Sequence, residues 1–387
     1  MGNSLEKSSE KSRADLIEMK VLFFSSYNSH HDCKWINRIS SDNQVQVIST
    51  EGQHRNKLNS DIQIHKILPL YTLRRKKRNQ VLLIIDQIIR EFQPDIVHSM
   101  YLFPNSIWAN ESRFKPHVIT TRGSDILVEY PNNYHNITSK FKPLIYRHFN
   151  KVCKRALLNA DYITCTSEFQ ADKIRRLTKT HVKTVRTGID IEKIDAVIST
   201  NEIQKDEAYI IFSPREPKPL YNLDVIVKAF HLFLNKCDKA ILVMLTDDSL
   251  YSQKINKLVH ALEIEENVRL ITELNFAELI KQYRVSSQVI MIPTSDGTPN
   301  TALEAMLCKT PVILGHANYD EVIFNLNTIS KIAKPEHEIL AKEMNKVYCM
   351  EEVELSAQTE RASSVVRLNA NLSDSIQSIT AIYNQVR

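Results

Sequence analysis

A loop in the second half of the chain carries residue types that suit a nucleotide sugar. The loop Pro293–Glu304, PTSDGTPNTALE, follows the apolar run Val289–Ile292 and leads into a segment with helical spacing. Asp296 and Glu304 place a carboxylate at each end, where carboxylates accept hydrogen bonds from sugar and ribose hydroxyls. The amides that open a helix lie between them and favour phosphates. The spacing therefore predicts a site for a nucleotide diphosphate sugar.

The helix after this loop is expected at Thr301–Lys309, with Asn300 as its N-cap. Its first amides, at Asn300–Ala302, then face the diphosphate. Arg215 follows a predicted strand and precedes a proline-rich loop, so its planar guanidinium is the expected cation for the same phosphates. The alternatives are a surface position for Arg215 and a helix-start pairing role for Glu304.

Short apolar runs that alternate with helical segments must position these residues. Such alternation predicts parallel sheets covered by helices, and therefore an α/β protein. In the first half the predicted strands are Lys20–Ser25, Val45–Ser49, Asp95–Ser99, His117–Thr121, Tyr162–Thr166 and Lys183–Arg186. In the second half they are Tyr209–Ser213, Ala240–Thr246, Val268–Thr272 and Val289–Pro293. Predicted helices include Asn79–Phe92, Leu223–Leu234 and Phe276–Val285.

Length and composition favour two globular domains joined near the polar stretch Glu192–Glu207. The chain has 387 residues, more than the roughly 250–300 that one hydrophobic core accommodates. No apolar run reaches the roughly 20 residues of a membrane-spanning helix, and the first residues lack the apolar stretch of a secretory signal. Six cysteines without paired or metal-finger spacing indicate reduced thiols and a cytosolic protein. No metal is expected, because Asp247 and Asp248 are adjacent and form no Asp-x-Asp motif.

Charge is distributed unevenly along the chain. Residues 1–200 contain 31 Lys and Arg against 20 Asp and Glu, a net charge of +11, and residues 201–387 contain 19 against 25, a net charge of −6. The run Arg74, Arg75, Lys76, Lys77 and Arg78 precedes the helix predicted at Asn79. A solvated face is the plain interpretation, but anionic lipid attracts such runs. Nucleic acid is not the expected partner, because the run has no interleaved aromatic residues.

The segment SDGTPNTALEAMLCKTPVI resembles the signature of the family 4 retaining glycosyltransferases of the GT-B fold. In that family two glutamates separated by seven residues bind the donor sugar and the nucleotide ribose, and Asp296 stands here at the first of them. The segment FSPREPKPLYNLDVIVKAF continues the resemblance, with Arg215 at the phosphate-gripping arginine. PDIVHSMYLF, ITTRGSDIL, YITCTSEFQADKI and RTGIDIEKI follow the family order in the first half, so that the resemblance spans the chain from about Lys20.

The resemblance implies a set of site residues. The expected catalytic residues are Asp296, Arg215 and Arg122. The expected donor-binding residues are Lys218, Gly297, Thr298, Pro299, Asn300, Thr301, Ala302, Glu304, Thr272, Glu273 and Leu274. The expected residues on the acceptor side are Ser26, His30, His31 and Asp125. For Asp125 the alternative role is to cap a helix that begins near Ile126. For His30 and His31 the alternative is a solvated pair in a loop. His98 is expected to be a packed strand histidine.

Several positions depart from the family pattern. Arg122 replaces the histidine of a His-Gly-Ser-Asp segment that reaches the donor sugar and the acceptor, and it suits a phosphate or an acidic acceptor instead. Tyr221 and Asn222 stand where many relatives have Lys-Gly, so Lys218 is the expected substitute cation. Thr272 and Lys309 occupy positions that are usually glycine. Glycine permits positive φ and close backbone approach, so these losses bear on how tightly the nucleotide is held.

Together these features predict two doubly wound, Rossmann-like domains of the GT-B type that face each other across a cleft. The expected parts are a polar tail at 1–17, an acceptor-binding domain at 18–195, a nucleotide-sugar-binding domain at 196–370, and a C-terminal helix at 371–387 that packs back on the first domain. The expected activity is retaining transfer from a nucleotide diphosphate sugar to a hydroxyl of a glycan or a lipid-linked acceptor, in surface polysaccharide or glycolipid synthesis. The expected place is the cytoplasm, peripherally on the inner face of an anionic membrane. The alternatives are a non-catalytic relative that binds or regulates a partner and, less favoured, a nucleotide-sugar epimerase of similar shape.

Overall fold

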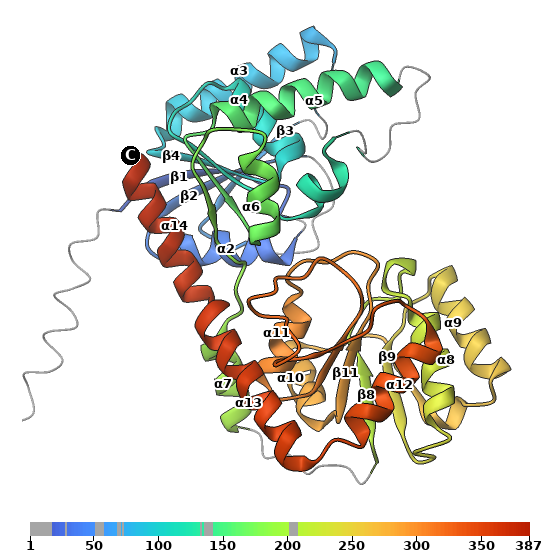
Figure 1. Cartoon of the computed structure of the whole chain (residues 1–387). Coiled ribbons are helices and arrows are strands. Elements are labelled where there is room, and N and C mark those ends of the chain that lie inside the picture. The colour runs from blue at the N-terminus through green and yellow to red at the C-terminus, as the bar shows by residue number, and fades with distance from the viewer. Residues whose placement is uncertain are drawn as a thin grey trace, which may run out of the picture. The chain divides into compact units, whose positions relative to one another are not determined.

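The computed structural model describes residues 18–27, 29–50, 58–67, 71, 73–131, 134, 142–200 and 208–387. The predicted polar tail and the second part of the predicted linker, 201–207, lie outside the described residues. The chain divides into two compact units (Figure 1). The first unit contains the residues up to Val185 together with Ile376–Arg387, and the second unit contains Arg186–Ser375.

The first unit is built on a parallel sheet with the strand order β3-β2-β1-β4-β5-β6-β7. Its strands are β1 (Lys20–Phe24), β2 (Gln44–Thr50), β3 (Gln63–Ile67), β4 (Ile96–Met100), β5 (His117–Thr120), β6 (Tyr162–Cys165) and β7 (Val182–Thr184). Its helices are α2 (His30–Ser40), α3 (Arg75–Phe92), α4 (Ile107–Glu111), α5 (Lys142–Asn159), α6 (Glu168–Arg175) and the last part of α14 (Leu372–Val386). Short helical turns η1 (Leu102–Ser106) and η2 (Asp125–Glu129) follow β4 and β5.

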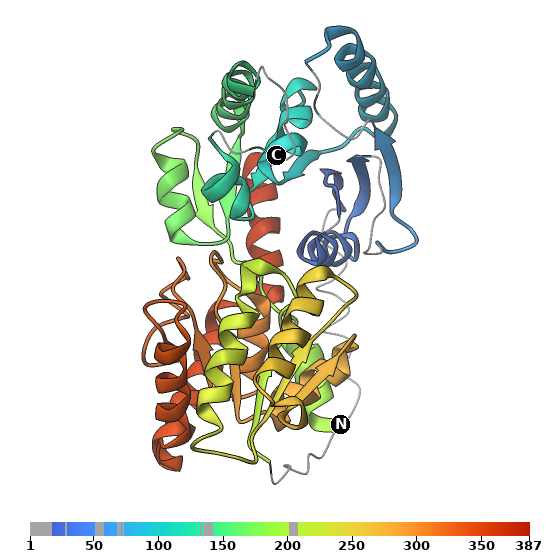
Figure 2. The same cartoon turned by 90° about the vertical axis from the view of Figure 1, so that its right-hand side faces the viewer.

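The two faces of this sheet carry different helices. Buried residues of α3, α4, α5 and α6 form one core with alternate residues of the strands, such as Leu22 and Phe24. Phe23 points to the other face, where it contacts His98, and His98 contacts Tyr383 of α14. Figure 2 shows α4 between α5, in green, and α3, in blue, on the first of these faces.

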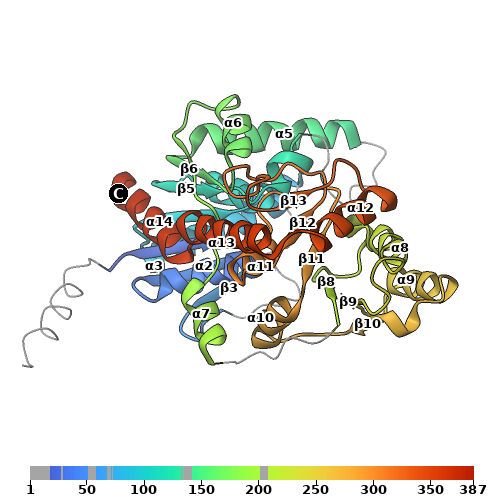
Figure 3. The same ribbon diagram turned by 60° about the horizontal axis from the view of Figure 1, so that its bottom comes forward.

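The second unit repeats the plan with the strand order β10-β9-β8-β11-β12-β13, which Figure 3 shows by its labels. Its strands are β8 (Ile210–Ser213), β9 (Ile241–Leu245), β10 (Val268–Ile271), β11 (Gln288–Met291), β12 (Val312–Leu314) and β13 (Ser330–Lys331). Its helices are α7 (Ile191–Thr200), α8 (Leu223–Phe233), α9 (Leu250–Ala261), α10 (Phe276–Val285), α11 (Asn300–Leu307), α12 (His337–Tyr348) and α13 (Glu352–Asn369), with helical turns η3 (Pro219–Tyr221) and η4 (Glu265–Asn267). One core joins α7, α10, α11 and α13 to the sheet, and another joins α8, α9 and α12.

The predicted α/β class with two parallel sheets is confirmed, and three local predictions are wrong. The stretch predicted as a linker begins inside α7, because Ile191 and Ile194 recur at helical spacing and are buried. The units divide at Val185, before the predicted domain boundary. The basic run does not precede a helix but forms the first turn of α3.

Candidate active site

In the second unit, two predicted site residues meet at the carboxyl ends of neighbouring strands. Arg215 follows β8 and Asp296 follows β11, and the Nη2 group of Arg215 donates a hydrogen bond to Oδ2 of Asp296. Oδ1 of Asp296 accepts from the Gly297 amide at 2.8 Å. The guanidinium lies over the ring of Tyr221, 4.9 Å from its centroid. Both charged side chains are partly accessible, with 14% of Arg215 and 21% of Asp296 exposed.

Buried polar atoms without a partner lie on this side of the unit. The Nε group of Arg215 and the hydroxyls of Tyr319 and Ser213 are buried and have no hydrogen-bond partner among the described residues. Burial, and then the charge of Asp296, raises the pKa of Tyr319, so its hydroxyl stays protonated and can donate. Buried polar atoms are rarely left unsatisfied in folded proteins. These donors therefore suit a polar ligand at the Arg215–Asp296 pair.

The helix that opens beside this pair differs from its prediction. α11 begins at Asn300, its N-cap is Pro299, and no side chain caps it. Asn300 is therefore the first helical residue and not the cap. The amide of Ala302 donates to the carbonyl of Pro299 at 3.0 Å, so it is not available to a diphosphate as predicted. Thr301 uses its hydroxyl locally, 3.1 Å from the sulfur of Met291.

Glu304 lies one turn further along α11 and is half-buried. Its Oε2 accepts from the buried hydroxyl of Tyr283 at 3.4 Å. Burial, and then the charge of Glu304, raises the pKa of Tyr283 well above its ordinary value, so Tyr283 remains a donor. This contact orients the carboxylate on the surface of α11.

The remaining donor-side residues are more exposed. Lys218 forms an ion pair with Glu216, and 57% of its side chain is exposed. Thr272 and Glu273 are exposed and Leu274 is half-buried after β10, which β9 and β8 separate from β11. Three strand spacings of about 4.8 Å place this loop roughly 14 Å from β11 in the sheet direction. The carboxyl edge of the sheet thus presents two groups of predicted residues, one near the Arg215–Asp296 pair and one well apart from it.

Two positions that the family resemblance marks as glycine have the backbone conformation that glycine favours. Asn222 has φ of 51° and Lys309 has φ of 57°. A side chain in this left-handed region carries a steric cost, which asparagine bears more easily than lysine. The amide side chain of Asn222 also donates to the carbonyl of Ile292 at 2.7 Å, which ties the loop before α8 to the end of β11. The backbone path is therefore kept without glycine.

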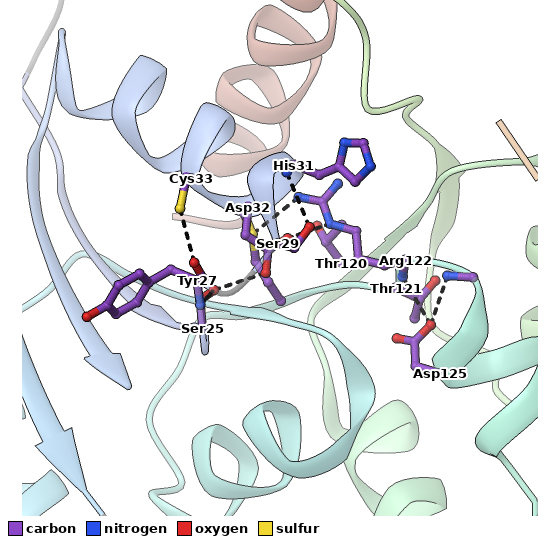
Figure 4. A network of polar contacts seen from close by, with 12 residues as sticks. Ser25, Tyr27, Ser29, His31, Asp32, Cys33, Thr120, Thr121, Arg122 and Asp125 are labelled. Carbon is purple, nitrogen blue, oxygen red and sulfur yellow. Dashed lines mark hydrogen bonds and ion pairs between the residues drawn. The ribbon is translucent and has the colours of Figure 1, made fainter. Parts of the chain in front are cut away.

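In the first unit, Arg122 follows β5 and reaches Asp32 at the start of α2 (Figure 4). Its Nε donates to Oδ1 of Asp32 at 2.8 Å, and 8% of Arg122 and 6% of Asp32 are exposed. The other carboxylate oxygen of Asp32 accepts from Ser25 at 3.0 Å. The guanidinium also lies 4.6 Å from the ring centroid of Trp35. The predicted catalytic cation is thus held by two side chains of α2, and Ser25, after β1, anchors one of them.

Asp125 is a buried organiser of the loop that carries Arg122. Its Oδ1 accepts from the amides of Arg122 at 3.1 Å and Gly123 at 2.9 Å, and its Oδ2 accepts from the amide of Leu102 at 2.9 Å. Only 1% of Asp125 is exposed. Burial raises the pKa of its carboxyl to about 6, against the lowering effect of these amides. Asp125 therefore acts on the site through the backbone, as the first residue of η2, whose N-cap is Ser124.

The other acceptor-side candidates lie around the start of α2. Ser29 is the N-cap of α2 and accepts from the amide of His31 at 3.2 Å. His30 is exposed, while His31 and Ser26 are half-buried. His98 is fully buried, as predicted for a packed histidine, and its ring nitrogens lie 2.6 Å from the Tyr383 hydroxyl and 2.7 Å from that of Thr120. Burial, and then the charge of Arg122, holds the pKa of His98 well below its ordinary value.

Sequence reasoning missed the partner of Arg122 and the aromatic residues near Arg215. Asp32 lies 90 positions before Arg122, and nothing in its local pattern marks it. Tyr221 was noted only as a departure from lysine, and Tyr319 carried no signal at all.

Two further properties concern the described part of the chain. None of its helices has both the length and the apolar character needed to cross a membrane. Its residues also contain no group of three or more His, Cys, Asp and Glu side chains arranged to hold a metal ion.

Known families match most of the chain. The model described as glycosyl transferase 4-like matches residues 20–167, and the model described as glycosyl transferases group 1 matches residues 194–363. A search of curated proteins found no match.

Solved structures also resemble the chain. Sucrose-phosphate synthase of Thermosynechococcus elongatus has a TM-score of 0.73 at 13% identity, covering 95% of this chain and 99% of its own. A glycosyltransferase of Rickettsia africae has a TM-score of 0.73 at 16% identity, covering 96% and 99%. HepE of Anabaena, in complex with UDP-glucose, has a TM-score of 0.67 at 15% identity, covering 95% and 100%. With its two parallel α/β units and both family matches, the chain belongs to the group 1 glycosyltransferases and is a glycosyltransferase of the GT-B fold.

Proposed function

We propose that this enzyme transfers a sugar from a nucleotide diphosphate sugar, with retention of anomeric configuration, to a hydroxyl acceptor. The observation that carries the donor assignment is the Arg215–Asp296 pair with buried, unpartnered donors near it. HepE, a similar fold, was solved with UDP-glucose, which supports a nucleotide sugar as the co-substrate. The match of SDGTPNTALE to the signature of a retaining family supports retention.

In this proposal the donor opens the ion pair. The guanidinium of Arg215 turns its two donor edges to the diphosphate, and Asp296 is released to accept a hydrogen bond from a sugar hydroxyl. Glu304, oriented by Tyr283, accepts from the ribose hydroxyls. Negative charge grows on the leaving diphosphate as its bond to the sugar breaks. Arg215 and the positive end of the α11 dipole stabilise that charge without a metal ion.

The first unit is the proposed acceptor-binding part. Arg122, fixed by Asp32 and Trp35, offers a positioned cation near the half-buried His31. A cation in place of the family's histidine favours an acceptor that carries a phosphate or a carboxylate. The net charge of +11 on residues 1–200 supports a glycan or lipid-linked acceptor at an anionic membrane surface, in surface polysaccharide or glycolipid synthesis. All six cysteines are free, which supports work in the reducing cytoplasm, on the inner face of that membrane.

The test is a panel of UDP-, GDP- and ADP-sugars incubated with the enzyme and a lipid extract, with release of the nucleotide diphosphate as the readout. Release from one donor class, unaffected by EDTA, is the expected result. The anomeric proton coupling of the product, measured by NMR, reports the stereochemistry. Loss of release in Arg215→Ala separates enzyme turnover from contaminating hydrolysis. Inversion at the anomeric carbon, or release that needs a divalent metal, contradicts the corresponding part of the proposal.

A further inference from the structure

A pocket of about 460 Å³ lies in the first unit among α3, α4 and α5. Four arginines from three segments line it, namely Arg75 and Arg78 at the start of α3, Arg113 after α4, and Arg155 near the end of α5. Only Arg75 and Arg78 belong to the basic run visible in the sequence. The fold therefore adds two arginines to that run and closes them around a common space.

The positive charge of this arginine pocket is not balanced within it. Glu111 is the one acidic side chain among the described residues that line it. One oxygen of Glu111 accepts from the Tyr71 hydroxyl at 2.5 Å, and the other lies 3.5 Å from Nε of Arg78. No acidic side chain of the described residues pairs with Arg75, Arg113 or Arg155. Three guanidinium groups thus remain to bind an anion. Their planar, forked donors suit phosphate oxygens.

Two features of the arginine pocket oppose stability in the unliganded protein. The first turn of α3 has basic residues and no acidic one, although a helix N-terminus favours negative charge. Arg113 has φ of 62°, in the left-handed region that is costly for a residue with a long side chain. Both features direct arginine side chains to the same pocket. A bound anion offsets the first cost, and the second is the kind of local strain that marks functional positions.

Exposed leucines beside the arginine pocket indicate which anion it takes. On α3, Leu83 is 66% exposed and follows the pocket residue Asn79 by four positions, and on α5, Leu158 is 51% exposed and follows Arg155 by three. Residues three and four apart lie on the same side of a helix. Among the described residues, no aromatic side chain on which a base could stack lines the pocket. Basic and exposed apolar residues on one surface fit a lipid interface better than nucleic acid.

We infer that this arginine pocket binds the phosphate of an anionic phospholipid headgroup. The inference rests on the proposed membrane association and goes beyond it, because it replaces a diffuse attraction of the basic run by a built site. Arg113 and Arg155 line the pocket but do not belong to the basic run. Variants of these two residues therefore distinguish a built phosphate site from diffuse attraction.

The test compares two double variants that remove the same charge. Arg113→Gln with Arg155→Gln alters the arginine pocket, and Lys76→Gln with Lys77→Gln alters exposed residues of α3 outside its lining. Binding is measured to phosphatidylcholine vesicles with and without phosphatidylglycerol. If the attraction is diffuse, removal of each positive charge weakens vesicle binding about five-fold, to the same extent in both variants. The pocket predicts that its variant binds anionic vesicles at least about ten-fold more weakly than the lysine variant.

Soluble glycerol phosphate is the second probe, since it carries the headgroup chemistry without a membrane. Wild-type protein is expected to show NMR shift changes at saturating probe that the arginine variant lacks and the lysine variant keeps. A third variant, Arg113→Gly, relieves the backbone strain and is expected to raise Tm while it weakens vesicle binding. A fold defect cannot produce that combination.

Each remaining outcome overturns a defined claim. Equal losses in the two double variants leave membrane association standing and overturn the arginine pocket as a lipid site. If the wild-type protein does not bind anionic vesicles, both membrane association and the lipid site in the arginine pocket are overturned. Binding of single-stranded RNA that depends on Arg113 and Arg155, without vesicle binding, reassigns the pocket to nucleic acid.

Discussion

The two units share one arrangement of charge. In each, an arginine follows a strand of a parallel sheet, pairs with an aspartate and lies over an aromatic ring. Arg122 pairs with Asp32, and Arg215 pairs with Asp296. The distance from guanidinium carbon to ring centroid is 4.6 Å in the first unit and 4.9 Å in the second.

The surroundings of the two pairs differ. Asp32 also accepts from Ser25, and the pair in the first unit is almost completely buried. In the second unit 14% of the arginine is exposed against 8% in the first, and 21% of the aspartate against 6%, and Nε of Arg215 has no partner among the described residues. An ion pair enclosed in this way holds a cation at a fixed place, whereas a pair with unused donors can exchange its partner for a ligand. The same three side-chain types thus serve positioning in one unit and ligand exchange in the other.

The largest expected effect tests the enclosed pair. Asp32→Ala leaves a buried guanidinium without its carboxylate, which costs about 3–5 kcal/mol of unfolding free energy. Asp296→Ala, the matched change in the second unit, costs about 1 kcal/mol because its partner is closer to water. Urea unfolding measures both. Similar losses in the two variants would remove the distinction between the pairs.

The next effect tests ligand exchange. Arg215→Lys keeps the charge but loses the planar fork, so kcat/KM for nucleotide release is expected to fall about 100-fold. Arg122→Lys keeps a cation beside Asp32 and is expected to reduce kcat/KM by less than about 10-fold. The reverse order would assign the donor phosphates to Arg122.

A smaller effect tests the unpartnered hydroxyl near the second pair. Tyr319→Phe removes one donor and is expected to weaken donor binding about 5- to 10-fold in calorimetry, the scale of one hydrogen bond. Its unfolding free energy is expected to stay constant, since the hydroxyl has no protein partner among the described residues.

Tyr383→Phe is the matched control, because that hydroxyl lies 2.6 Å from His98. It is expected to cost about 1 kcal/mol of stability and to leave donor affinity unchanged. Weaker donor binding in Tyr383→Phe alone would contradict the assignment of Tyr319.

The smallest effect concerns Lys218. Its side chain is 57% exposed and is paired with Glu216. Lys218→Gln is therefore expected to change kcat/KM by less than about three-fold. A loss as large as that of Arg215→Lys would show that Lys218 replaces the lysine that the family carries at Tyr221.

The sheets could be predicted from the sequence because buried parallel strands are continuous apolar runs. The exceptions have physical causes. β3, Gln63–Ile67, lies at the sheet edge and buries only Ile67 completely, so it lacks an apolar run. α7 was hidden because polar residues separate its buried isoleucines.

The candidate site could be predicted only where its residues are contiguous. The loop around Asp296 was found because glycine, proline and acidic residues cluster there. The pairing of Arg215 with Asp296, 81 positions apart, depends on β8 and β11 being neighbours in the sheet, which no local pattern encodes. Asp32 lies in α2, after β1, and Arg122 follows β5, so their pairing depends on a sheet order in which only β4 separates β1 from β5.

The return of Ile376–Arg387 to the first unit has a consequence for synthesis on the ribosome. Tyr383 is fully buried against His98, and Arg387 lies 3.1 Å from Asp95 in the same unit. These residues are translated only after the whole of the second unit, although domains tend to fold as they emerge, N-terminal first. The nascent first unit therefore lacks the cover that Tyr383 gives to His98 while nearly 200 further residues are made. Its final folding step is set by translation of the other unit, and a stalled chain that lacks Tyr383 presents the uncovered region around His98 to chaperones and proteases.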